Sequence, residues 1–138
     1  MPHFTLEYSD NLRHLDARAC LRAVNAALVR TGQFDEVDIK SRARSVAVFE
    51  VGVPAAAAPE DTARGIDAAS HAGRPERAFA AGQLAVLTGR PPEVRQALTR
   101  CVLNALEAAI APHPGLHLQV TVELVEIDRA SYVKAVRP

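Results

Sequence analysis

The sequence predicts an α+β fold in which a four-stranded mixed sheet carries two helices on one face. Residues 1–53 and 77–128 each hold a strand pattern, a helical pattern and a second strand pattern, the order of a β-α-β unit. The two helical patterns also match at five apolar positions, each pair separated by 81 residues: Ala17 and Leu98, Cys20 and Cys101, Leu21 and Val102, Val24 and Ala105, Leu28 and Ala109. We interpret this match as an internal duplication, although any two amphipathic helices can be aligned in this way.

The first unit opens with a strand. Phe4, Leu6 and Tyr8 alternate with polar neighbours, which is the period of a half-buried strand. Residues 9–11 are polar, so we expect them to end the strand and to offer side chains that cap the following helix. The apolar stripe described above predicts that helix, and Gly32 is placed to end it in a left-handed conformation.

A second strand is predicted from Ile39 to Val53. Its apolar residues point to both sides, with Val46 and Val48 on one side and Ala47, Phe49 and Val51 on the other. This pattern is typical of a strand buried on both faces. Because the chain supplies only two helices, both on one face of the sheet, we expect another subunit to cover the other face. The pattern therefore predicts a homo-oligomer.

The second unit repeats the order of the first. The segment from Leu84 to Leu87 predicts a strand, and Gly89 and Arg90 predict a turn. Pro92 stands where the first turn of a helix tolerates proline. The closing strand has the clearest pattern in the chain, a strict alternation of apolar and polar residues from Leu116 to Leu124.

The whole chain, residues 1–138, is predicted to be one domain. Its two units are joined by a loop at about residues 54–76, rich in proline, alanine and glycine, and a tail follows at residues 129–138. A loop of this length in a compact domain is either a functional lid or a mobile excursion, and its composition favours mobility. A helical turn over residues 63–70 is the most structure that we expect there.

Composition narrows the class of protein. Sixteen basic and sixteen acidic residues give a net charge of zero, which argues against nucleic acid as a partner. No apolar run approaches the ~20 residues that a membrane-spanning helix needs, and the N-terminus lacks the pattern of a signal peptide. With only two cysteines, Cys20 and Cys101, both on apolar helix stripes, the chain fits a reducing compartment. We expect a soluble cytoplasmic protein.

Common catalytic motifs are missing from the sequence. The five histidines lack the spacing of a zinc site, so no metal centre is predicted, and no glycine-rich phosphate loop occurs. The N-terminus offers a different candidate. Removal of Met1 would leave Pro2 as a free secondary amine at the start of a strand. Burial and nearby cations lower the pKa of such an amine, so Pro2 could act as a general base near neutral pH. Many proteins carry proline at this position without any catalytic role.

Several short segments resemble the 5-carboxymethyl-2-hydroxymuconate isomerase family of the tautomerase superfamily. They occur in family order and span most of the chain outside the 54–76 loop: Met1-Pro2-His3-Phe4, Glu7-Tyr8-Ser9-Asp10-Asn11-Leu12, Val24-Asn25, Thr31-Gly32-Gln33-Phe34, Ile39-Lys40-Ser41-Arg42, Gly89-Arg90, Glu93 and Arg95-Gln96. The N-terminal segment is the most specific. Gly89-Arg90 at the start of a helix is also similar to a turn of 4-oxalocrotonate tautomerase, a relative with a single β-α-β unit.

The resemblance implies a duplicated β-α-β fold, a homotrimer and an active site without a cofactor. It implies a 1,3-keto–enol tautomerisation in the catabolism of aromatic compounds, with an unsaturated 2-hydroxy or 2-oxo di- or tricarboxylate as substrate. Pro2 would take the proton from the 2-hydroxyl group and return one to carbon five. Arg90 would stabilise charge on the 2-oxygen, and Lys40 and Arg42 would bind substrate carboxylates, a task suited to arginine forks.

Two features depart from the family pattern, and two other functions stay open. Lys40 stands where the family has an arginine, and the loop at 54–76 is longer than the family's connection. The superfamily also includes dehalogenases and a decarboxylase that use the same proline. A retained Met1 would hold the Pro2 nitrogen in a peptide bond, in which case a binding module without catalytic activity is the alternative.

Overall fold

The structure, a computed structural model, describes residues 1–53 and 75–138 of the chain. Within these residues the order of elements is β1 (His3–Ser9), α1 (Ala17–Arg30), β2 (Lys40–Val46), β3 (Glu76–Leu87), α2 (Pro92–Ala109) and β4 (Leu116–Ile127), with short 3₁₀ turns at Glu36–Asp38 and Arg129–Ser131. The expectations about a lid, mobility or a helical turn at 54–74 concern residues outside the described part.

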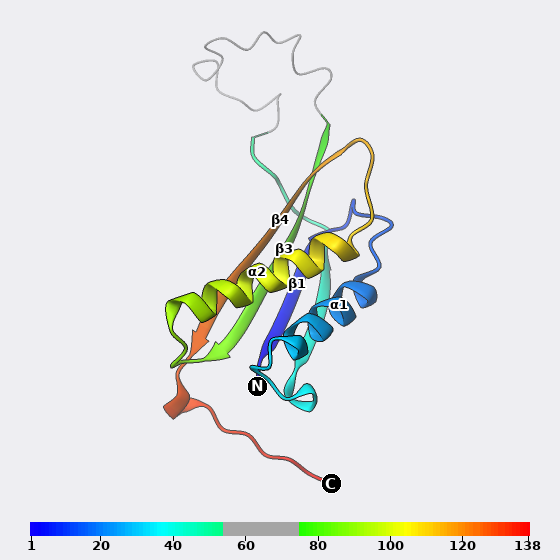
Figure 1. Cartoon of the computed structure of the whole chain (residues 1–138). Helices are drawn as coiled ribbons and strands as arrows, with labels where there is room; N and C mark the ends of the chain where they lie inside the picture. Colours follow the sequence, from blue (N-terminus) through cyan, green and yellow to red (C-terminus); the bar gives the residue numbers. More distant parts are fainter. Residues whose placement is uncertain (54–74) are drawn as a thin grey trace.

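The four strands form one mixed sheet in the order β2-β1-β3-β4. The pairs β1–β2 and β3–β4 are parallel, whereas the central pair β1–β3 is antiparallel. Both helices lie on the same face of the sheet (Figure 1). The predicted α+β architecture, a four-stranded mixed sheet with two helices on one face, is therefore confirmed.

The core lies between the helices and that face of the sheet. Alternate residues of β1 and β3 point into it, and α1 and α2 cover them with the apolar stripes that the sequence predicted. The largest side chains with less than 2% exposure are Phe4, Leu6, Val24, Leu28, Leu84, Val86, Leu98, Val102 and Leu106. Both cysteines pack at the helices: Cys20 is fully buried, and the Cys101 thiol lies 3.6 Å from the carbonyl oxygen of Ala27 in α1.

The ends of the helices agree with the sequence in two places and differ in one. Gly32 has a φ of +68° just after α1, as predicted, and Pro92 is the first residue of α2, after the cap Pro91. The predicted cap of α1 is wrong, however. Asp16, not residues 9–11, accepts a hydrogen bond from the Ala19 N–H at 2.9 Å.

Two expectations about the second strand are also wrong. It ends at Val46 instead of Val53, because its partner β1 ends at Ser9 and the register has no further pairs. It is also an edge strand that is not buried on both faces, and Val48 beyond its end is 93% exposed. The expected cover of the other face of the sheet by another subunit stays a prediction.

The sheet face turned away from the helices is polar at its centre. A shallow hollow there is lined by Thr5 and Glu7 of β1, Gln83 of β3 and Thr121 and Glu123 of β4, among others. Gln83 donates a hydrogen bond to Glu123 across the β3–β4 pair at 2.7 Å. In the described residues, no helix is both long and apolar enough to cross a membrane.

The third strand is longer than the sequence indicated. β3 begins at Glu76, eight residues before Leu84, and its first half contains the small residues Ala78, Ala80 and Gly82. All three are buried, and a Cβ atom built at Gly82 would lie only 2.9 Å from the ring of Phe4. Gly82 has no room for a side chain because Phe4 of β1 and Leu106 of α2 fill the space above it.

Candidate active site

One end of the sheet gathers the four residues that the sequence singled out. Pro2 directly precedes β1, and Lys40 and Arg42 lie at the start of the neighbouring strand β2, where His3 pairs with Lys40 and Thr5 with Arg42. Because β3 runs antiparallel to β1, its last residues lie beside the start of β1. Arg90 follows three residues after β3 ends. The topology therefore brings all four to the same edge of the molecule.

Pro2 is held firmly at this edge. Its side chain is buried to within 2% and faces the core in alternation with His3, while its carbonyl oxygen accepts a hydrogen bond from the Lys40 N–H at 3.2 Å. In the chain with Met1 present, the Pro2 nitrogen is part of a peptide bond. The terminal ammonium of Met1 then lies 3.1 Å from Oδ2 of Asp38.

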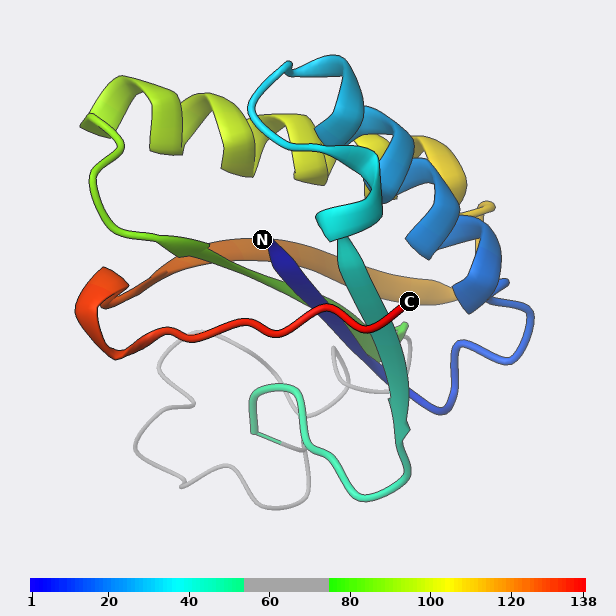
Figure 2. The same ribbon diagram turned by 90° about the horizontal axis from the view of Figure 1, so that it is seen from below.

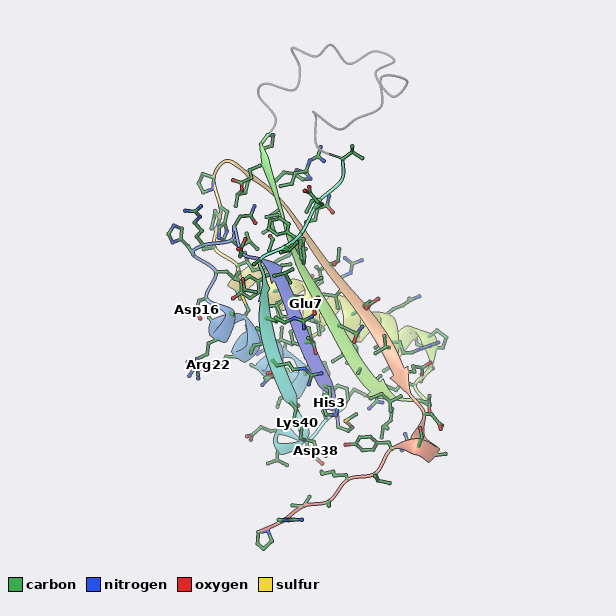
Figure 3. The ribbon with its side chains drawn as sticks, turned by 180° about the vertical axis from the view of Figure 1, so that it is seen from behind. His3, Glu7, Asp16, Arg22, Asp38 and Lys40 are labelled. Carbon is green, nitrogen blue, oxygen red and sulfur yellow. The ribbon has the colours of Figure 1, made fainter. Side chains whose placement is uncertain are left out.

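The surroundings of Pro2 are positively charged. Burial lowers the pKa of the His3 imidazole from its ordinary value, and the charges of Lys40, Arg42 and the N-terminus lower it further. His3, Lys40 and Asp38 lie close together at the end of the β1–β2 pair (Figure 3). The Lys40 ammonium donates to the carbonyl oxygen of Asp38 at 3.1 Å. Arg44, one alternate position further along β2, is instead paired with Glu7.

Arg90 is fixed by two contacts at the end of β3. Its guanidinium lies over the ring of Phe34, 4.9 Å from the ring centroid, and donates to the carbonyl oxygen of Leu87 at 3.1 Å. The Nε atom is buried and has no hydrogen-bond partner among the described residues. Burial, and after it the charge of Arg129, lower the pKa of Arg90 from its ordinary value. A guanidinium remains charged under any such shift, so this end of the sheet keeps its positive charge.

Asp38 lies at the centre of a second group of contacts that sequence reasoning did not find. Its carboxylate pairs with the N-terminal ammonium and with the ammonium of Lys134, which belongs to the tail after β4. These two interactions lower the pKa of Asp38 to about 2. Figure 2 shows the tail running from the end of β4 across toward β2. Asp38 and Lys134 are 96 residues apart, so no local sequence pattern could have predicted their contact.

Phe34 and Arg129 were also missed as neighbours of Arg90. Phe34 stood in a matched segment, but its position over a guanidinium depends on how the two units pack. Arg129 donates to the carbonyl oxygen of Thr88 at 3.1 Å. Among the described residues no group of three or more His, Cys, Asp or Glu side chains could hold a metal ion. Together these contacts place a buried Pro2, several cationic side chains and the Asp38 carboxylate at one end of the sheet, and cationic side chains of this kind can bind carboxylates.

Comparisons of the sequence and of the structure with known proteins point to the same family. The model of the family described as 5-carboxymethyl-2-hydroxymuconate isomerase matches residues 2–136. A crystal structure of a 5-carboxymethyl-2-hydroxymuconate isomerase from Deinococcus radiodurans R1 has a TM-score of 0.75 at 24% identity, covering 99% of this chain and 90% of that one. None of the curated proteins matches the chain in sequence.

Two further solved structures share the fold. A 5-carboxymethyl-2-hydroxymuconate delta-isomerase has a TM-score of 0.66 at 21% identity, covering 99% of this chain and 87% of that one. A fused 4-OT protein, described as a symmetric trimer, has a TM-score of 0.63 at 17% identity, covering 96% of this chain and 91% of the other. These identities are low enough that the likeness shows the fold alone.

Proposed function

Because the chain belongs to the 5-carboxymethyl-2-hydroxymuconate isomerase family, and is thus an isomerase of the tautomerase superfamily, we propose that its base is the amine of Pro2. The proposed reaction is a 1,3-keto–enol tautomerisation of an unsaturated 2-hydroxy or 2-oxo di- or tricarboxylate, without a cofactor. The single observation that carries the proposal is the position of Pro2, which is buried directly before β1, with Lys40 and Arg42 at the start of the neighbouring strand β2.

The proposed mechanism begins with removal of Met1, which frees the Pro2 nitrogen. In this proposal, burial of the ring and the neighbouring charges of Lys40 and Arg42 disfavour the protonated form of the amine, which must be neutral to act as the base. The neutral amine takes the proton from the 2-hydroxyl group as the C–O bond becomes a carbonyl. As the carbonyl forms, the C2–C3 double bond moves to C3–C4, and the electrons of the C4–C5 double bond take the proton from the protonated amine at carbon five. This restores the neutral base and leaves the atoms and charges balanced.

The cations have separate roles in this proposal. Arg90, with an Nε that lacks a protein partner among the described residues, stabilises negative charge as it develops on the 2-oxygen. Lys40 and Arg42 are exposed at the mouth of the site and bind the substrate carboxylates. Lys40 offers a point charge, whereas Arg42 offers a planar fork, so we expect Arg42 to fix the orientation of the substrate.

A homotrimer and a location in the cytoplasm are part of the same proposal. The fused 4-OT relative is described as a symmetric trimer, which supports the oligomer. The polar, open face of the sheet is the surface that we expect to lie between subunits. Sedimentation equilibrium of the purified protein measures the subunit number directly.

The test follows ketonisation of 2-hydroxymuconate by ultraviolet absorbance, after intact-mass analysis has verified that Met1 is removed. Pro2→Ala should lower kcat by about 100-fold or more, since a positioned general base contributes ~10²–10⁴. Circular dichroism and thermal unfolding serve as the check that the fold persists. An unchanged rate in a folded Pro2→Ala protein would refute the proline mechanism.

A second variant tests the role of Arg90. Arg90→Ala should lower kcat/KM for the same dienol by about 100-fold, the usual effect of losing one donor to a developing oxyanion. Arg100→Ala, which removes an exposed cation from α2, is the matched control and should leave kcat/KM within twofold.

Two further measurements discriminate the alternative functions. Turnover of a 3-haloacrylate or of malonate semialdehyde, with no ketonisation of the dienol, would select a dehalogenase or decarboxylase. Retention of Met1 in the native source would favour a binding module, because the Pro2 nitrogen would then be part of a peptide bond and could not act as a base.

A further inference from the structure

The carboxylate of Asp38 connects the two ends of the chain. Its Oδ2 atom lies 3.1 Å from the terminal nitrogen of Met1, and its Oδ1 atom is paired with Nζ of Lys134. Asp38 itself is fixed in the short 3₁₀ turn before β2, where its N–H donates to the carbonyl oxygen of Asp35 at 3.0 Å. A single carboxylate thus bridges the N-terminal amine and a lysine of the C-terminal tail.

The tail is held at this point by charge. Val133 and Val136, on either side of Lys134, are 89% and 79% exposed, so they contribute little apolar packing. The Lys134 ammonium is paired with Asp38, and this interaction raises the pKa of Lys134 from its ordinary value. The ion pair therefore joins the C-terminal tail to the 3₁₀ turn before β2.

Removal of Met1 would leave the Pro2 nitrogen close to the same carboxylate. The nitrogens of Met1 and Pro2 are separated by only three covalent bonds, so standard bond lengths keep them less than about 4 Å apart. Pro2 is also anchored by the hydrogen bond between its carbonyl oxygen and the Lys40 N–H. The new terminal amine is consequently confined to the neighbourhood of Asp38.

We propose that Asp38 is a positioning residue that holds the N-terminal amine of the processed chain, and that Lys134 offsets its charge. The proposal rests on the proposed function in so far as the amine is the catalytic base. An unopposed carboxylate stabilises the protonated amine and raises its pKa, which leaves less of the neutral base near pH 7, whereas a carboxylate already paired with Lys134 does so far less. The C-terminal tail therefore adjusts the basicity of the other end of the chain.

Other charged and titratable groups come from the elements that meet at this end of the sheet. His3 belongs to β1, Lys40 and Arg42 belong to β2, and Arg90 and Arg129 follow β3 and β4. Asp35, in the loop before Asp38, and Tyr132, in the tail, act electrostatically on Lys134. Because Asp38 is the acidic group in direct contact with the N-terminus, its pairing is the feature that a single substitution can change.

The experiment measures the titration of the Pro2 amine directly, by ¹⁵N NMR of protein labelled with [¹⁵N]proline and free of Met1. Lys134→Met should raise the midpoint by roughly half a unit to one unit, and Asp38→Asn should lower it by a similar amount. The double variant should return near the unmodified value, because both charges are then missing. The acidic limb of the kcat/KM profile for the dienol should move in parallel, while kcat/KM at high pH stays within a few-fold.

Two control variants change the charge by the same amount at residues outside the Asp38–Lys134 ion pair. Arg137→Met removes another cation from the tail, and Glu36→Gln removes an exposed carboxylate from the 3₁₀ turn that contains Asp38. Both should leave the midpoint within about 0.2 unit, because exposed charges are screened by salt and solvent.

The outcomes separate this proposal from the proposed function. If the NMR midpoint shifts as expected but no variant, nor the unmodified protein, converts the dienol, then the Asp38–Lys134 link stands and the isomerase mechanism fails. If the dienol is converted but Lys134→Met leaves both the midpoint and the acidic limb in place, the link is overturned. A shift of the midpoint in the opposite direction would overturn it equally.

Discussion

The guanidinium of Arg90 lies over the ring of Phe34, with Cζ 4.9 Å from the ring centroid. Phe34 follows α1 in the first β-α-β unit, and Arg90 precedes α2 in the second. The contact therefore joins the two units at the end of the sheet where Pro2 lies, and it limits the positions that the guanidinium can adopt. A group that must meet a developing negative charge benefits from this restriction.

Loss of the Phe34 ring should affect turnover more than substrate binding, because Arg90 acts on charge that develops in the transition state. We expect Phe34→Leu to lower the free energy of unfolding by about 1 kcal/mol, through loss of the cation–π contact, and to lower kcat several-fold with little change in KM. Phe49→Leu is the matched control, since Phe49 packs edge-on against Phe79 away from Arg90. It should destabilise the fold with kcat unchanged; an equal fall of kcat in both variants would contradict the positioning role.

Gly82 should tolerate no side chain while Phe4 is present. A Cβ atom at this position would lie 2.9 Å from Cε2 and 3.1 Å from Cζ of Phe4, and 3.4 Å from Leu106. We expect Gly82→Ala to lower the free energy of unfolding by about 1–3 kcal/mol, as overpacking of a close-packed core does. Denaturant unfolding measures the effect. In a Phe4→Leu background the same change should cost less, and equal costs in both backgrounds would argue against the overlap.

Ser9 should be required for the end of the β1–β3 ladder. Its fully buried hydroxyl accepts a hydrogen bond from the Phe79 N–H at 3.0 Å and lies 3.4 Å from the Phe79 carbonyl oxygen. Ser9→Ala leaves that N–H without its partner, so we expect a loss of about 1–3 kcal/mol in unfolding free energy. Ser45→Ala, at an exposed position of β2, should change it by less than about 0.5 kcal/mol. Similar values for the two variants would show that the hydroxyl is dispensable.

Docking of the C-terminal tail should depend on pH, because protonation of Asp38 removes its ion pair with Lys134. The pKa of Asp38 is lowered from its ordinary value of 3.8 to about 2, first by its hydrogen bond with Lys134 and then by that with the N-terminus. A lowered pKa means that the carboxylate contributes stability above about pH 4 and loses it as the pH falls through about 2. A ¹³C NMR titration of the Asp38 carboxyl should show this midpoint. In Lys134→Met the midpoint should move up toward 3.8, and a midpoint already near 3.8 in the unmodified protein would contradict the pairing.

The sequence located most elements because their patterns are local. The alternation in β1 and β4 and the apolar stripes of α1 and α2 report which side chains face a core, whatever covers them. Gly32 and Pro92 marked helix ends through backbone chemistry that belongs to the residue itself. The start of β3 was missed because Ala78, Ala80 and Gly82 have weak strand preferences.

For the candidate site and its surroundings, too, local segments could be recognised in the sequence, whereas features that depend on the path of the chain could not. Segments around Pro2, Lys40, Arg42 and Arg90 could be matched to a family, since each is short and continuous, and their catalytic roles stay a prediction. The cap Asp16 was missed because several polar residues precede α1 and only the path of the chain decides which one reaches the helix. The edge position of β2 was missed because an apolar run looks the same at the centre and at the edge of a sheet.

By itself, the sequence determined the order of strands and helices along the chain and showed that Pro2 directly precedes the first strand. Only the tertiary structure decided the strand order, the stacking of Arg90 on Phe34 and the bridge from Asp38 to both chain ends. The physical reason is the separation along the chain over which each kind of interaction acts. Backbone preference and hydrophobic periodicity act over a few residues, whereas contacts between charges 96 residues apart exist only after the core has fixed the positions of the strands.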